Sequence, residues 1–120
     1  MGCANCTSDR NLKHDIEAID AQAVLQSVAR LPISTWSYKV DDPSVRHMGP
    51  MAQDFYAAFG LGNSERTYNA IDAHGVTLAA IQALNERLEE QNARIERLEL
   101  ENHYLRDRPM DKQADAIKSR

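Results

Sequence analysis

The sequence contains few of the residues that define several large classes of protein. Only two of its 120 residues are cysteines, which is too few for a disulfide-rich scaffold. No stretch of about 18 consecutive apolar residues occurs, so we expect no membrane insertion. The N-terminus has no charged region followed by an apolar stretch, which predicts no signal peptide. Five glycines and four prolines are too few for a linker or a collagen-like chain.

Positive charge is scarce as well. The chain has 14 Lys and Arg against 18 Asp and Glu, which gives a net charge of −4 at pH 7. Proteins that bind nucleic acid mainly through its phosphates are usually basic. We therefore expect no nucleic-acid partner. The length and a hydrophobic content of 42% allow one modest domain with an extension.

The order of polar and apolar residues divides the chain into four zones. Residues 1–12 are small, polar and aperiodic, which is typical of an irregular lead-in. Residues 13–72 mix helix and strand signals and predict a small α+β part. Residues 73–106 form one long helical pattern. Residues 107–120 are charged and have no apolar stripe, so we expect a flexible tail.

A short helix is predicted near the start of the mixed zone. Asp20 is a good N-cap for a helix over residues 21–30, and Pro32 would end it, because the residue before a proline avoids the helical region. The predicted apolar face consists of Val24, Leu25, Val28 and Leu31.

Two strands and a second helix are predicted in the rest of this zone. Alternation over residues 36–40 indicates a half-buried strand, and a second short strand is expected over residues 67–71. Between them, Gly49-Pro50 would begin a helix that Gly60 closes. Its predicted buried stripe, which we expect to share one core with Trp36, consists of Met51, Ala52, Phe55 and Phe59.

The long helix, for which Asp72 is the predicted cap, has a heptad pattern. Two sets of residues, each spaced by seven and offset by three, form an a/d seam. The a positions are Ile81, Leu88, Ile95 and Asn102, and the d positions are Leu84, Gln91, Leu98 and Leu105.

A helix with such a seam needs partners, because a single chain offers nothing to cover it. In a parallel assembly, Arg94 at g would face Glu99 at e, and Glu101 would face Arg106, so both pairs have opposite charge. Leucine at d suits a dimer, whereas mixed Ile and Leu at a is compatible with a trimer. A surface helix lying on its own globular part is the alternative. The predicted fold is a small α+β part followed by a helix that forms a parallel trimeric coiled coil.

Ser8 and Lys13 are candidates for chemistry. A serine hydroxyl becomes a nucleophile when a base removes its proton, and a neutral lysine can be that base. Such a lysine must have its pKa lowered from about 10.4 toward neutrality by burial or by neighbouring cations. On an ideal helix the two residues would not share a face, so a loop would have to bring them together. Taken alone, the spacing is a very weak signal, and a capping serine with a solvated lysine explains the pair better than a catalytic dyad does.

Three motifs in order resemble one known family. The string Ser8-Asp9-Arg10-Asn11-Leu12-Lys13-His14-Asp15-Ile16 is similar to the opening of the self-cleaving intramolecular chaperone domain at the C-terminus of phage endosialidases and tail fibres, which also occurs in the myelin regulatory factor family. The segment His47-Met48-Gly49-Pro50-Met51-Ala52-Gln53-Asp54-Phe55 resembles the second motif of that family. The third consists of Asp72-x-x-Gly75 followed by a helix with Ala80, Gln82 and Ala83.

The resemblance implies a function and a site. Such domains help trimeric fibres or tailspike-like proteins to fold and then cut themselves off through a serine–lysine dyad. Carried over, Ser8 would be the nucleophile and Lys13 the general base, with Asp9, Asn11 and His47 as candidate supporting residues. The implied partners are two further copies of the chain and an upstream client destined for a virion tail or a cell surface. Only seven residues precede Ser8, so we expect that client to lie outside this chain. No cofactor or metal is implied.

Two other interpretations stay open. The chain could be a trimerisation or adaptor module in which Ser8 and Lys13 are inert. Cys3 and Cys6 form a Cys-x-x-Cys motif that could be a redox pair or half of a zinc site, although no second such motif exists. His47, His74 and His103 have no spacing typical of metal ligands.

Overall fold

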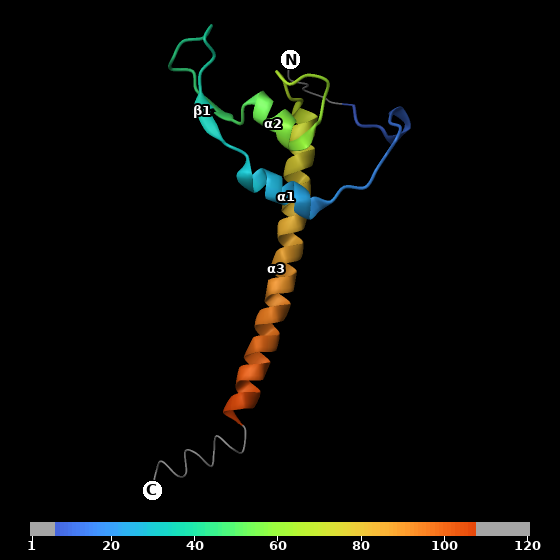
Figure 1. Cartoon of the computed structure of the whole chain (residues 1–120), viewed down its shortest axis with the longest axis vertical. Helices are drawn as coiled ribbons and strands as arrows, with labels where there is room; N and C mark the ends of the chain where they lie inside the picture. Colours follow the sequence, from blue (N-terminus) through green and yellow to red (C-terminus); the bar gives the residue numbers. More distant parts are fainter. Residues whose placement is uncertain (1–6, 108–120) are drawn as a thin grey trace. The chain divides into compact units, whose positions relative to one another are not determined.

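The computed structural model describes residues 7–107 of the chain, and it has the predicted α+β composition with a long C-terminal helix (Figure 1). Its elements are the 3₁₀ helix η1 (Arg10–Leu12), α1 (Ala21–Arg30), β1 (Ser34–Trp36), β2 (His47–Gly49), α2 (Ala52–Phe59) and α3 (Ala70–Arg106). The contacts divide the chain into two units, Met1–Leu84 and Asn85–Arg120.

Helix α1 has the predicted bounds. The Asp20 side chain accepts a hydrogen bond from the backbone N–H of Ala23 at 3.2 Å, and the helix ends at Arg30, just before Leu31 and Pro32. Its buried residue, Leu25, packs against two small side chains of α3 in the main core cluster of the described residues. Those side chains are Ala80 and Ala83, and the second is completely buried.

The strand prediction for residues 36–40 is wrong in its bounds. β1 ends at Trp36 and pairs antiparallel with β2, with Ser34 opposite Gly49 and Trp36 opposite His47. The alternation beyond Trp36 continues into the connecting loop, where the backbone N–H of Asp41 bonds to the carbonyl of Tyr38 and starts a turn. β2 was not predicted, because its three residues show no clear alternation.

The loop between the strands is held by short polar contacts. Arg46 donates from Nη1 to Ser37 Oγ at 3.1 Å and from Nη2 to Thr35 Oγ1 at 3.0 Å. The Ser44 backbone N–H donates to Asp42 Oδ1 at 2.9 Å, and this bond, helped by the Ser44 side chain, lowers the pKa of the Asp42 carboxyl. These bonds hold a loop that has little apolar packing.

Helix α2 begins later than predicted and ends where predicted. Gly49 belongs to β2, so the helix starts at Ala52 rather than at Gly49-Pro50. Gly60 closes it in the left-handed conformation, with φ 62°. Within the helix, Phe55 is buried; its ring stacks on that of Tyr68 and lies tilted against that of Phe59.

Helix α3 begins before its predicted cap. The strand expected over residues 67–71 is absent there, because the Asn69 side chain accepts from the backbone N–H of Ile71 at 3.0 Å and starts the helix at Ala70. Asp72, the predicted cap, lies in the first turn instead. No helix within residues 7–107 has the length and apolarity needed to span a membrane.

The ring contacts within residues 7–107 form two aromatic groups. Trp36 is half-buried and contacts Tyr38 and His47, with ring centroids 4.7 and 5.0 Å away. The ring of Phe55 contacts those of Phe59 and Tyr68 instead. That Trp36 and the α2 stripe share one core therefore stays a prediction.

Candidate functional site

Ser8 and Lys13 are in direct contact. The Lys13 Nζ donates a hydrogen bond to Ser8 Oγ, with the two atoms 2.6 Å apart. The five-residue spacing would separate them on an α-helix, but here the chain turns tightly between them through η1. The turn through η1 is thus the non-helical connection that the two side chains need in order to make contact.

The turn is stabilised by its own hydrogen bonds. Asp9 is the N-cap of η1, and its Oδ1 accepts from the backbone N–H of Asn11 at 2.9 Å and from Asn11 Nδ2 at 3.1 Å. The backbone N–H of Leu12 donates to the Asp9 carbonyl at 3.1 Å, and that of Lys13 donates to the Arg10 carbonyl at 3.2 Å. On the sequence alone, Asp9 and Asn11 are candidate supporting residues without a defined role. An Asp side chain that accepts from the backbone N–H two residues later is a known turn signal and could have predicted this contact.

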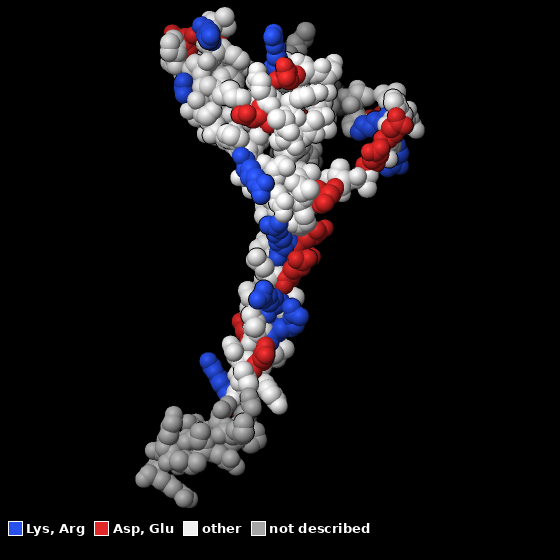
Figure 2. Space-filling view, in the orientation of Figure 1, with Lys and Arg blue, Asp and Glu red and all other residues white. Residues whose placement is uncertain are grey.

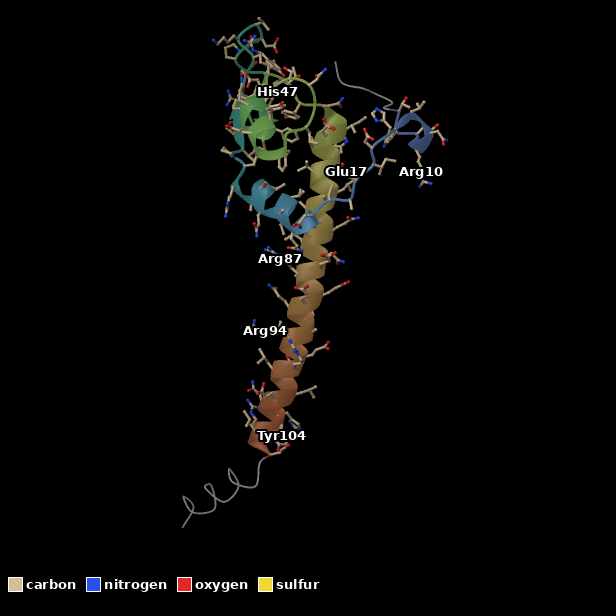
Figure 3. All side chains as sticks on the ribbon, turned by 45° about the vertical axis from the view of Figure 1, so that its right-hand side comes forward. Arg10, Glu17, His47, Arg87, Arg94 and Tyr104 are labelled. Atoms are coloured by element: carbon tan, nitrogen blue, oxygen red, sulfur yellow. The ribbon has the colours of Figure 1, made fainter. Side chains whose placement is uncertain are left out.

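The surroundings of the pair are open to solvent. Every residue from Thr7 to Asp20 is exposed, including the apolar side chains of Leu12, Ile16 and Ile19. Figure 3 shows Arg10 on η1 and Glu17 on the stretch that leads to α1. After Lys13 the chain changes direction at Asp15, whose φ is 53°, and His14 Nδ1 lies 3.0 Å from Asp15 Oδ2.

The contact suits proton transfer between the two side chains. A protonated lysine donates to the serine oxygen, whereas a neutral lysine amine accepts the serine proton over the same distance. A hydroxyl in contact with an amine is one of the arrangements that acyl transfer can use.

The other three histidines lie on β2 and on α3. The ring of His47 stacks on Trp36 and contacts Tyr38, and none of the described contacts joins it to Ser8 or Lys13. His74 is exposed on α3, and His103 Nε2 lies 3.2 Å from Oδ2 of Asp107, which directly follows the end of that helix. Within residues 7–107 no cluster of three or more acidic or histidine side chains could hold a metal ion. Cys3 and Cys6 lie outside the described residues.

The heptad seam is a second candidate surface. All eight of its side chains lie on α3 and are exposed. Exposure of the apolar members ranges from 39% at Leu105 to 57% at Leu88. Figure 2 shows acidic and basic side chains mixed along this helix, without a large area of one sign.

Comparison with known proteins identifies the first part of the chain. The model of a peptidase-type family described as chaperone of endosialidase matches residues 8–60. The match begins at Ser8, includes Lys13 and the two strands, and ends at the glycine that closes α2. No curated protein matches the chain. The match supports the resemblance drawn from the first two sequence motifs, because residues 8–60 are similar to an endosialidase-type chaperone domain.

Proposed function

We propose that this chain is an intramolecular chaperone that trimerises, aids the folding of an attached fibre or tailspike-like client, and then releases itself by autoproteolysis at Ser8. The observation that carries this proposal is the 2.6 Å contact between Lys13 Nζ and Ser8 Oγ. It lies at the start of the segment that matches the chaperone family.

In the proposed reaction Ser8 is the nucleophile and Lys13 the general base. The neutral amine of Lys13 takes the hydroxyl proton while Ser8 Oγ attacks the carbonyl carbon of a peptide bond at the cleavage point. The bond from that carbon to nitrogen breaks, and the departing amine takes the proton from the Lys13 ammonium. Water then hydrolyses the ester on Ser8 to a carboxylic acid and restores the hydroxyl. No cofactor takes part in this sequence.

Assembly would switch this chemistry on. Both side chains are exposed in the single chain, where water stabilises a charged lysine. Covering the turn with a neighbouring protomer or with the client would remove that water and favour the neutral amine. It would also hold the scissile bond against Ser8. Cleavage would then follow assembly.

The seam of α3 supports the assembly step. Its apolar side chains recur every three to four residues, yet half or nearly half of the surface of most of them is exposed. Packing three such helices in parallel would bury the seam and would pair Arg94 with Glu99, and Glu101 with Arg106, between neighbours. The family resemblance favours three chains over two.

The test is a fusion of an upstream fibre segment to residues 1–120, compared with the same fusion carrying Ser8→Ala or Lys13→Ala. We expect the parent to split near residue 8 on a denaturing gel and the Ser8→Ala fusion to stay intact. Loss of a general base typically slows a reaction by about 100- to 10,000-fold, so Lys13→Ala should be cut very slowly.

The competing function is a trimerisation or adaptor module without catalysis, which the exposed seam also supports. A parent fusion that assembles but stays whole would favour that module. Cleavage of the Ser8→Ala fusion at the parent rate would contradict the proposed nucleophile and point to a contaminating protease.

A further inference from the structure

The contact between Ser8 and Lys13 depends on a turn that has no packed core beneath it. None of the residues of η1 is buried, and the residues on either side of it are exposed. Apolar packing therefore contributes little to the closed form of the turn. Its hydrogen bonds decide how often Lys13 reaches Ser8.

Asp9 makes more of these bonds than any other described residue of the turn. Its carboxylate accepts from the backbone and from the side chain of Asn11, and its carbonyl accepts from Leu12. Asp9 lies directly after Ser8, so the turn that it holds begins next to the backbone of Ser8. Asn11 adds one side-chain bond, and its backbone bond would survive truncation of the side chain.

We infer that Asp9 is a positioning residue of the dyad. Its side-chain oxygen holds the turn closed by accepting hydrogen bonds, and the negative charge of the carboxylate is not needed for this. Asn11 is its weaker partner. This inference rests on the proposed function for its effect on cleavage. Asp and Asn are about equally good helix N-caps, whereas Ala lacks an acceptor. The two substitutions at one position therefore separate the hydrogen-bonding role of the Asp9 side chain from its charge.

The test uses the fusion described above with Asp9→Ala, Asp9→Asn or Asn11→Ala. Removal of a cap typically lowers the equilibrium constant for closing by about fivefold, so Asp9→Ala should slow cleavage by up to about fivefold. Asp9→Asn should restore a rate near that of the parent, and Asn11→Ala should fall between the two. All three should keep the oligomeric mass of the parent, measured by light scattering. Parent-rate cleavage in Asp9→Ala would overturn the inference, as would an Asp9→Asn variant as slow as Asp9→Ala.

A second measurement does not require cleavage. In a Ser8→Ala chain of residues 1–120, NMR gives the exchange rates of the Asn11 and Lys13 amides with water. We expect Asp9→Ala to speed both about fivefold and Asp9→Asn to leave them nearly unchanged. If the fusion is not cut but the amides respond in this way, the proposed function fails and the positioning role of Asp9 stands. Exchange rates of these amides that stay unchanged in Asp9→Ala would refute the positioning role, whether or not the fusion is cleaved.

Discussion

At the scale of single residues, our proposal gives Lys13 a task that no other cation can take over. Its Nζ contacts the Ser8 hydroxyl, so a neutral amine at this place could accept the hydroxyl proton. Arginine at this position could still donate a hydrogen bond to Ser8. Its guanidinium stays protonated at any working pH and cannot accept the serine proton.

We therefore expect Lys13→Arg to abolish cleavage of the fusion while leaving its assembly intact. Arg10→Ala is the matched control, because it removes a neighbouring positive charge but keeps the Arg10 carbonyl that accepts from Lys13. Time courses on denaturing gels would measure both. Efficient cleavage of Lys13→Arg would show that Lys13 acts through its charge and not as a base.

Phe55 is the buried aromatic residue on which α2 depends. It is 3% exposed and lies 4.8 Å from the ring of Tyr68 and 4.9 Å from that of Phe59. Phe55→Ala should lower the free energy of unfolding by about 3–5 kcal/mol, because it leaves a cavity. Tyr56→Ala, on the exposed side of the same helix, should cost less than about 1 kcal/mol. Urea unfolding at one protein concentration would compare them, and equal losses would contradict a core centred on Phe55.

At the scale of elements, two glycines should respond to alanine with opposite signs. A Cβ at Gly60 or at Gly75 would meet no atom within 4 Å, so crowding plays no part at either site. Gly60 has a φ of 62°, where a Cβ costs about 1–2 kcal/mol, so Gly60→Ala should destabilise the protein. Gly75 lies within α3, where alanine is favoured by about 1 kcal/mol. Thermal unfolding would check both signs, and stabilisation by Gly60→Ala would mean that the left-handed cap is not kept.

The elements also show what the sequence could and could not predict. Asp20, Pro32 and Gly60 act through their immediate neighbours, so the helix bounds that they set were predicted correctly. β1 is defined by its partner β2, which lies across a loop, and alternation alone placed the strand too far along the chain. Residues five positions apart do not share a face of an α-helix, so the spacing of Ser8 and Lys13 did not predict their contact. Only the resemblance to a family pointed to the pair.

At the scale of the whole molecule, the small globular part and the seam should depend on each other. Few large side chains are buried within residues 7–107, and a core of this size is marginal alone. Partner chains that bind only the folded state would stabilise that state. The seam therefore has two roles in our proposal, to join the chains and to stabilise each of them.

Replacing Leu88 and Ile95 together by serine should dissociate the assembly and lower the stability of the α1–α2 region. The matched control replaces Leu100 and Tyr104, which are 70% and 71% exposed and lie outside the seam. Light scattering should give the mass of one chain for the seam variant and that of three chains for the control. A parent protein with the mass of one chain at micromolar concentration would refute the coiled coil.

The bond between Ser8 and Lys13 joins residues that are five positions apart, so it is among the most local contacts in the molecule. Loops of this size close in about 10–100 ns, whereas subunits assemble over milliseconds to minutes. The two reacting groups therefore meet countless times in a nascent chain before any partner arrives. The order of events in our proposal cannot come from the encounter of the two groups. It would come instead from what assembly changes around them, which is the loss of water from Lys13 and the placement of the scissile bond against Ser8.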